Sequence, residues 1–167
     1  MLYFGFTWNR SLSWASSAYD ETLNKKNIKS LGLNDFGKKI VTICNENGII
    51  IDVSHIGENS FWDVFNYSSK PFIASHSSVY NLCNHFRNLK DDQIIAIKDK
   101  GGIIGLNPYP AFIDPTFKIK EENFRKKISS ELKDIKLTYD SNEAEGFEES
   151  KTLQWIKTQH FMQKKSS

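Results

Sequence analysis

Two histidines each follow a short apolar run of the sequence. His55 follows residues 49–54 and His76 follows residues 71–75. The residues between the two runs, 58–69, have a helical pattern, so the segment is typical of a strand–helix–strand unit. A right-handed crossover places such strands in parallel in one sheet, with both imidazoles at the same edge. Two imidazoles at one edge favour a metal site, and neutral imidazole suits zinc.

Two ligands are too few for a catalytic zinc ion, which takes about three from the protein. Asp52 is a poor candidate for the third, because strand alternation turns it away from His55. We expect Asp52 to support the ligands or to pack. A histidine at the end of a strand is more often simply hydrogen-bonded, so a structural role for His55 and His76 stays open.

Arg87 lies in the loop after the second histidine run. Its guanidinium could hold a carboxylate through two parallel hydrogen bonds. The alternative is a solvated arginine that caps the loop, and without further context that interpretation is the simpler one.

Strands and helices alternate around these residues, as in an α/β fold. Strands are expected at residues 2–8, 49–53, 71–76 and 103–106, and helices at 34–47, 58–69 and 91–100. The polar residues 9–33 and 77–90 are expected to form long loops of the kind that carry active-site residues. Four strands with flanking helices amount to about half of a TIM-type (β/α) barrel, that is, a partial barrel.

The character of the sequence changes after residue 117. Residues 121–136 and 145–162 have the pattern of charged, amphipathic helices with no strand between them. We therefore expect a partial (β/α) barrel over residues 1–117 and a charged helical extension over residues 118–167.

Length, charge and cysteine content exclude several classes of protein. A chain of 167 residues has room for one domain, but a complete (β/α)8 barrel takes about 250. The net charge of +2 gives no field that would indicate nucleic acid. Cys44 and Cys83 lack metal or redox spacing, which favours buried, reduced thiols. No run approaches a membrane span and the opening residues lack the basic start of a signal peptide, so we expect a cytoplasmic protein.

Six blocks of the sequence resemble the membrane (renal) dipeptidase family of zinc peptidases, in the family's order and spacing across residues 2–114. The blocks are residues 32–39, 51–55, 61–64, 73–77, 85–89 and 101–107. The resemblance implies a (β/α)8 barrel that hydrolyses dipeptides with two zinc ions. It also implies that His55 and His76 bind one of these ions, and that Arg87 binds the terminal carboxylate of the dipeptide substrate.

The sequence departs from the family pattern at several places. The family's His-x-Asp pair on the first strand, its bridging glutamate on the third and its catalytic aspartate on the last have no counterpart here, so no catalytic residue is assigned. Trp8 stands where many members have a histidine that stabilises the transition state. The matching parts correspond to strands four to seven of the barrel.

These departures leave more than one function open. The first hypothesis is a zinc metallodipeptidase fragment with little or no activity on its own. The alternative is a non-catalytic half-barrel, or a subunit of a split enzyme that needs a complementing chain or forms a homo-oligomer. A weaker third option is another metal-dependent amidohydrolase on a similar barrel.

Overall fold

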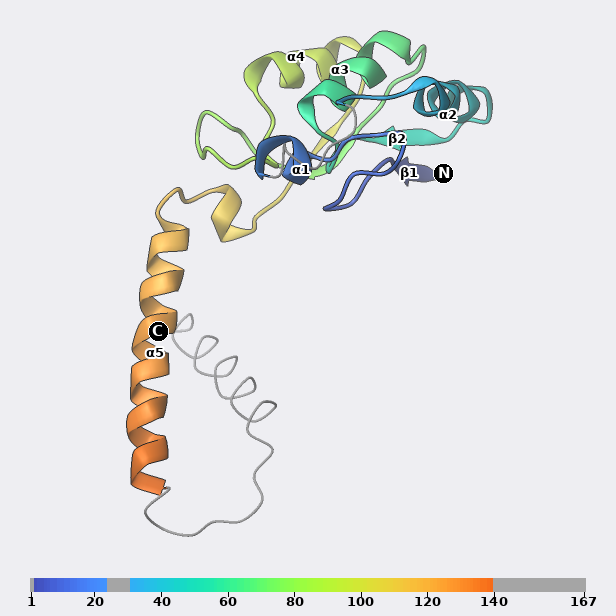
Figure 1. The fold of residues 1–167 in the computed structure, drawn as a ribbon. Coiled ribbons are helices and arrows are strands. Elements are labelled where there is room, and N and C mark those ends of the chain that lie inside the picture. Colours follow the sequence, from blue (N-terminus) through green and yellow to red (C-terminus); the bar gives the residue numbers. More distant parts are fainter. Residues whose placement is uncertain (1, 24–30, 140–167) are drawn as a thin grey trace. The chain divides into compact units, whose positions relative to one another are not determined.

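The computed structural model describes residues 2–23 and 31–139, with side chains up to residue 133. The chain divides into two units, residues 1–117 and residues 118–167, and every strand of the described residues belongs to the first. The elements of the first unit are β1 (Tyr3–Gly5), α1 (Ala18–Leu23), α2 (Asp35–Glu46), β2 (Ile50–Asp52), α3 (Glu58–Tyr67), β3 (Ala74–Ser77), α4 (Asp91–Asp99), β4 (Ile104–Leu106) and the 3-10 turn η2 (Pro110–Phe112). This order of strands and helices confirms the expected α/β fold (Figure 1).

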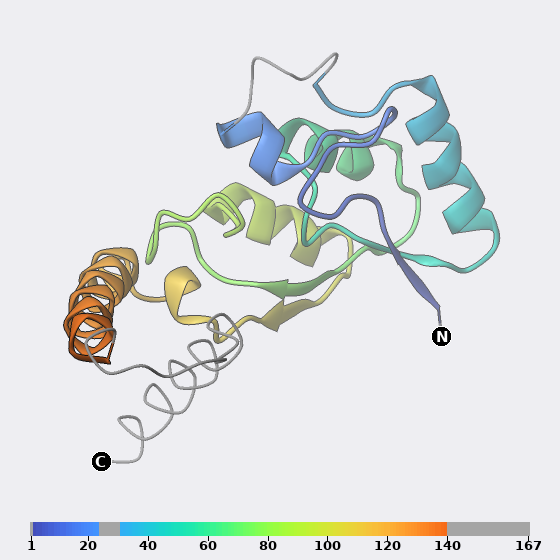
Figure 2. The ribbon, with the colours of Figure 1, turned by 60° about the horizontal axis from the view of Figure 1, so that its bottom comes forward.

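The four strands run parallel in the order β1, β2, β3, β4. β1 pairs with β2, and β3 pairs with β4, both in parallel. A parallel bridge between Asp52 and Ile73 joins the two pairs. There the Val53 N–H donates to the Ile73 carbonyl at 2.8 Å and the Ile73 N–H donates to the Ile51 carbonyl at 2.9 Å. β3 and β4 are seen side by side in Figure 2.

The helices α2, α3 and α4 lie on one side of the strands (Figure 1). The side chain of Asn34 caps α2 by accepting a hydrogen bond from the Gly37 N–H at 3.1 Å, as the sequence predicts. After α2 the chain reverses at Gly48, whose φ of +66° is in the left-handed region that glycine adopts most readily. Each helix therefore returns the chain to the start of the next parallel strand.

The core lies between the helices and the strands. Its apolar side chains come from both layers, and the largest of those that are fully buried are Phe6, Val41, Ile51, Phe61, Val64, Phe72 and Ile97. Cys44 and Cys83 are buried, free thiols, which confirms the interpretation drawn from their spacing. Burial raises the pKa of the Cys44 thiol.

Two expectations about this unit were wrong in detail. Residues 9–33 were expected to be irregular, but they contain the short helix α1. The Ser17 hydroxyl caps it by accepting from the Asp20 N–H at 3.1 Å, while Asp20 and Glu21 are buried against polar partners, so no apolar stripe marks the helix. β3 begins at Ala74 rather than at residue 71 and runs through Ser77, so His76 lies inside the strand.

The second unit begins within α5 (Phe117–Tyr139), which contains the expected helix at residues 121–136. Along α5 the side chain of Arg125 pairs with Glu121 one turn earlier, at 2.7 Å. The helix predicted at residues 145–162 lies outside the described residues, and the division into a barrel part and a helical extension stays a prediction. Among the described residues no helix is both long and apolar enough to cross a membrane.

Candidate metal centre

The structure brings His55 and His76 together. His55 lies in the turn after β2 and His76 in β3, and their Nε2 atoms are 3.0 Å apart. Two nitrogens that bind one zinc ion at about 2.0–2.1 Å must lie within about 4 Å of each other. The spacing of the two imidazoles is therefore compatible with a shared ion.

Trp8 covers one face of His55. The two rings are stacked, with centroids 4.5 Å apart and an angle of 18° between their planes. His55 is buried, whereas Trp8 remains largely exposed. An indole thus occupies the position where the family resemblance indicates a histidine in many members.

Arg87 is buried beside His55, which makes the simpler interpretation of a solvated arginine wrong. Its Nε donates to the Ser54 carbonyl at 2.7 Å, and its Nη1 lies 2.7 Å from Nδ1 of His55. An arginine side chain has donors only, so Nδ1 of His55 must accept. The His55 proton is then on Nε2, which donates to Nε2 of His76.

Asp52 lies beneath both histidines as a hydrogen-bond acceptor. Its Oδ1 accepts from the Ser54 N–H at 3.0 Å, the Ser54 hydroxyl at 2.6 Å and the Ser75 N–H at 3.1 Å. Its Oδ2 accepts from the Ser75 hydroxyl, which in turn lies 2.7 Å from Nδ1 of His76. Burial alone would raise the pKa of Asp52, but the hydrogen bonds from Ser54 and Ser75 outweigh it and lower that pKa.

The electrostatics of the site keep His55 neutral. Burial, followed by the positive charge of Arg87 and the neighbouring His76, lowers the pKa of His55 to about 4 against a weaker opposing effect of Asp52. Burial also lowers the pKa of Arg87, to about 10, which leaves it charged at neutral pH. Neutral imidazole is the form that binds metal ions.

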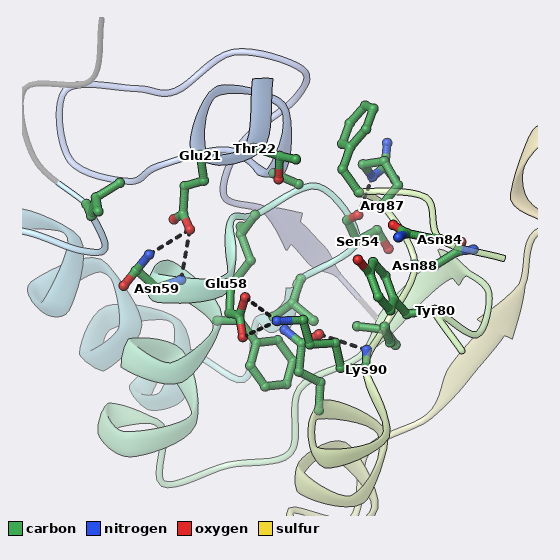
Figure 3. Close-up of a pocket in the computed structure, with 18 residues that line it drawn as sticks. Glu21, Thr22, Ser54, Glu58, Asn59, Tyr80, Asn84, Arg87, Asn88 and Lys90 are labelled. Atoms are coloured by element: carbon green, nitrogen blue, oxygen red, sulfur yellow. Dashed lines mark hydrogen bonds and ion pairs between the residues drawn. The ribbon is translucent and has the colours of Figure 1, made fainter. Parts of the chain in front are cut away.

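A cavity of about 550 Å³ opens next to this site, between α1, the start of α3 and the loop from β3 to α4 (Figure 3). Arg87 and Ser54 line it, but neither histidine is among its described lining residues. Within the described part of the chain, Nη2 of Arg87 and Oδ1 of Asn88 are buried without a hydrogen-bond partner. Arg87 therefore borders both the histidine pair and the cavity, with both N–H groups of Nη2 unpaired in the described structure.

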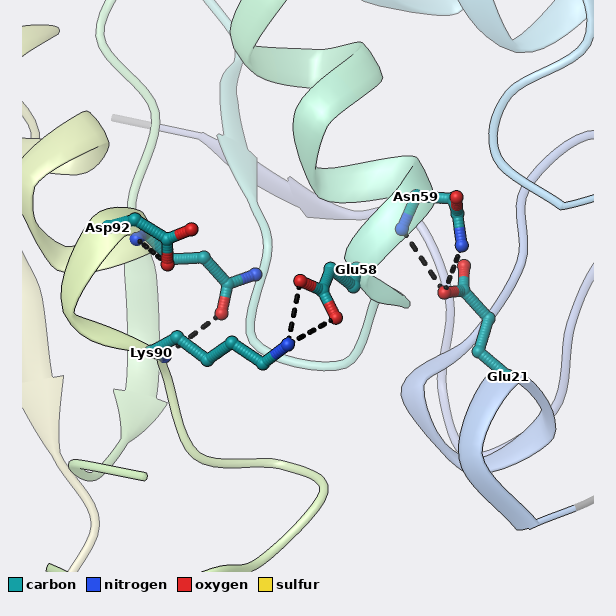
Figure 4. Close-up of polar contacts among 6 residues, drawn as sticks. Glu21, Glu58, Asn59, Lys90 and Asp92 are labelled. Carbon is teal, nitrogen blue, oxygen red and sulfur yellow. Dashed lines mark hydrogen bonds and ion pairs between the residues drawn. The ribbon is translucent and has the colours of Figure 1, made fainter. Parts of the chain in front are cut away.

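Two carboxylates hold the walls of the cavity in place (Figure 4). Glu21 of α1 is buried and accepts from the Ser16 hydroxyl and from both nitrogens of Asn59, at 3.1 Å for the backbone and 2.8 Å for the side chain. Glu58 at the start of α3 pairs with the Lys90 ammonium at 2.7 Å, and both of these side chains are partly exposed. None of these contacts is predicted from the sequence, although Ser17 and Asp20 form a capping signal for the helix that carries Glu21.

Comparison with known proteins identifies the family. The family model for membrane dipeptidase, peptidase family M19, matches residues 1–156. This chain belongs to the membrane dipeptidase family. The resemblance found in the sequence is thereby confirmed, and the hydrolase, dipeptidase and metallopeptidase classes apply at the level of the family.

Two solved structures and one further relative are similar to this chain. The probable dipeptidase PvdM from Pseudomonas aeruginosa is 33% identical, with a TM-score of 0.60 over 68% of this chain and 29% of its own. A metallopeptidase from Rhodobacter sphaeroides, liganded with a phosphinate mimic of the dipeptide L-Ala-D-Ala, is 28% identical, with a TM-score of 0.59 over 69% of this chain and 32% of its own. An uncharacterized protein in the pqqA 5′ region of Klebsiella pneumoniae is 40% identical over 82 residues, which are 49% of this chain and 30% of that protein.

The chain spans about a third of the length of the relatives it matches. Its four parallel strands and their helices correspond to part of the barrel of these dipeptidase relatives, which confirms the partial (β/α) barrel. The membrane dipeptidase family is a metallopeptidase family, so a metal ion belongs to its chemistry.

The residues present fit part of a metal site. Among residues 2–23 and 31–139, no group of three or more His, Cys, Asp or Glu side chains is placed to hold an ion. His76 carries its proton on Nδ1, which leaves the lone pair of Nε2 for a ligand bond. To bind through Nε2, His55 would have to move its proton from Nε2 to Nδ1 and turn Nδ1 away from Arg87, a change of tautomer with no net release of a proton.

Proposed function

We propose that this chain supplies part of a zinc metallodipeptidase centre, with His55 and His76 as ligands of one zinc ion. The distance of 3.0 Å between their Nε2 atoms is the observation that carries the proposal. Within the complete site of the family, two zinc ions are expected, and this chain would supply ligands for one. The bound metal would polarise the peptide carbonyl and activate a water for attack.

The proposed role of Arg87 is to bind the terminal carboxylate of a dipeptide. Its guanidinium is buried, it retains its charge, and its Nη2 has no partner in the described structure. A buried donor without a partner costs about 1–3 kcal/mol, which a carboxylate ligand would recover. The contacts with Ser54 and His55 hold the guanidinium of Arg87 in one orientation, which favours recognition of a planar carboxylate.

We infer that the chain alone has little or no peptidase activity. Catalytic zinc sites take about three protein ligands, and the described residues supply two imidazoles. Two divalent ions would also repel each other strongly without a bridging carboxylate, and none of the described carboxylates joins the two histidines as a ligand.

Zinc titration of the purified chain, followed by a dipeptide hydrolysis assay with L-Ala-D-Ala and L,L-dipeptides, tests these assignments. We expect one weakly bound zinc ion per chain, lost in His55→Ala and in His76→Ala, with no measurable turnover. Asp91→Ala is the control, since this exposed carboxylate accepts from the side chain of Asn81. Zinc binding that survives both alanine substitutions would exclude the assigned ligands, and robust hydrolysis by the chain alone would contradict the fragment function.

A second candidate function is that of a subunit that needs a complementing chain. In the described structure β1 pairs only with β2 and β4 only with β3, so each keeps an open edge. Large apolar side chains on and near these edges are exposed, among them Tyr3 and Leu106. Open parallel edges with exposed apolar residues favour pairing with further strands.

Co-expression separates the two functions. The chain is produced with and without a polypeptide that carries the remaining barrel strands of a family member, and complexes are isolated by size exclusion. Dipeptide hydrolysis by the complex alone supports the split enzyme. A monodisperse single chain, or a homo-oligomer, that ignores the added polypeptide argues against it.

A further inference from the structure

A chain of five hydrogen-bonded groups passes through the candidate metal centre. It runs from Arg87 to His55, from His55 to His76, from His76 to Ser75, and from Ser75 to Asp52. The two ends fix its direction, because the guanidinium can only donate and the Asp52 carboxylate can only accept. Every proton between them then has a single arrangement that satisfies all four contacts.

Asp52, at one end of this series of hydrogen bonds, determines through Ser75 which nitrogen of His76 carries the proton. The Ser75 hydroxyl gives its only proton to Asp52, so its oxygen is left as an acceptor towards Nδ1 of His76. His76 must therefore carry its proton on Nδ1, and its Nε2 presents a lone pair towards His55. Free imidazole has no such constraint and exchanges its proton between the two nitrogens.

We propose that Asp52 and Ser75 are positioning residues that hold His76 in the Nδ1–H tautomer, so that its Nε2 is available to a cation. This inference rests on the proposed zinc function, but the tautomer itself can be observed without metal. Neither Asp52 nor Ser75 touches the ion in this arrangement. They act through His76, as the outer partners of metal-binding histidines do.

A purely structural role makes a different prediction. Asp52 also accepts from the backbone N–H groups of Ser54, in the turn after β2, and of Ser75, and the Ser75 bond ties the end of β2 to β3. Replacing Ser75 by alanine removes only the hydroxyl and leaves both backbone bonds in place. If Asp52 serves the sheet alone, Ser75→Ala leaves the His76 tautomer unchanged.

The tautomer must be measured where His55 does not impose it. In the wild-type chain the Nε2–H of His55 also donates to His76, so we place the test in a His55→Ala background. Long-range ¹H–¹⁵N spectra of the imidazoles, recorded on the full chain in EDTA at about pH 8, report which nitrogen carries the proton. The remaining histidines are assigned by single substitution.

We expect the Nδ1–H form of His76 in His55→Ala and a shift to mainly Nε2–H when Ser75→Ala is added. Ser75→Thr keeps a hydroxyl and should retain Nδ1–H. Ser78→Ala is the matched control, because that half-buried hydroxyl donates to the Asn107 carbonyl and touches no residue of the site. The same Nδ1–H signal with and without the Ser75 hydroxyl would overturn the proposal.

Zinc affinity gives an independent measurement in the wild-type background. Outer-shell substitutions typically weaken metal binding by about 10–100-fold, and we expect a loss of about tenfold or more in Ser75→Ala with none in Ser78→Ala. If Ser75→Ala does not fold, an Nε2–H signal from His76 in the folded His55→Ala chain still overturns the proposal. If the His76 tautomer depends on Ser75 but the wild-type chain binds no zinc, the first result supports the positioning role and the second refutes the zinc function.

Discussion

The indole of Trp8 lies nearly parallel to the imidazole of His55, with 4.5 Å between ring centroids. Trp8 is 69% exposed and His55 only 8%, so the indole shields a buried imidazole while facing solvent itself. Burial is the largest cause of the low pKa of His55, and Trp8 supplies part of that burial.

Removing the Trp8 indole should bring the pKa of His55 closer to its ordinary value. In Trp8→Ala we expect the pKa of His55 to rise from about 4 towards 6.5, because water reaches the open ring face. An NMR titration of the imidazole measures the change. Ile95→Ala, which removes a similarly exposed side chain from α4, should leave this pKa where it is.

The low pKa of His55 also predicts how stability depends on pH in the metal-free chain. Between pH 6.5 and about pH 4 the unfolded chain takes up a proton at His55 that the folded chain refuses. The free energy of unfolding should therefore fall as the pH is lowered through this window, by roughly 3 kcal/mol at about 1.4 kcal/mol per pH unit. Urea denaturation in EDTA at a series of pH values tests this, and His55→Gln should show a correspondingly smaller decrease.

Arg87 should oppose metal binding, separately from its proposed role in carboxylate binding. Its Nη1 donates a hydrogen bond to Nδ1 of His55, and its positive charge repels a cation. Arg87→Met, which keeps much of the volume, should tighten zinc binding several-fold and raise the pKa of His55. Isothermal titration with zinc is the measurement. Arg10→Met removes an exposed arginine that pairs with Asp20 instead, and equal effects of the two substitutions would contradict a local role.

Glu21 and Glu58 form a matched pair of carboxylates on the cavity wall (Figure 4). Glu21→Gln alters a buried acceptor of three hydrogen bonds and should lower the free energy of unfolding by about 1–3 kcal/mol. Glu58→Gln disrupts a partly exposed ion pair with Lys90 and should cost less than about 1 kcal/mol. The two variants are compared by their urea denaturation midpoints, with the dependence of the unfolding free energy on urea held the same. A larger effect of Glu58→Gln than of Glu21→Gln would be inconsistent with these contacts.

A related steric prediction concerns Gly57, which precedes α3. A Cβ added there would overlap with the carboxylate of Glu21, so Gly57→Ala must displace a buried, hydrogen-bonded side chain. We expect a loss of about 2 kcal/mol or more in urea denaturation. At Gly5 an added Cβ would meet its nearest neighbour at 3.9 Å, so Gly5→Ala should have a much smaller effect.

Much of the barrel part could be predicted from the sequence. The helix between Asn34 and Gly48 follows from cap residues and apolar periodicity, and the helix from Glu58 to Tyr67 follows from apolar periodicity alone. The strand that leads to His55 follows from its nearly unbroken apolar run, which is typical of a parallel strand buried on both faces. These signals are local, so they can be detected in a single amino-acid sequence.

The missing features depend on contacts between distant segments. The helix α1 buries Asp20 and Glu21, and acidic residues satisfied by distant partners leave no apolar pattern to detect. A charged Arg87 is expected at the surface, and its contacts with Ser54, His55 and the Phe112 ring explain its burial. The roles of His55, His76 and Arg87 in binding remain predictions for the experiments above.

Asp52 binds one residue next to each histidine, namely Ser54 before His55 and Ser75 before His76. A single carboxylate thus links the residues that precede the two histidines across the junction of β2 and β3. A slip of β3 by one residue would turn each of Ser75 and His76 to the face opposite the one it occupies now. If the proposed zinc site needs both rings on one face, its loss would reveal a misaligned β3 in a preparation whose helix content is unchanged.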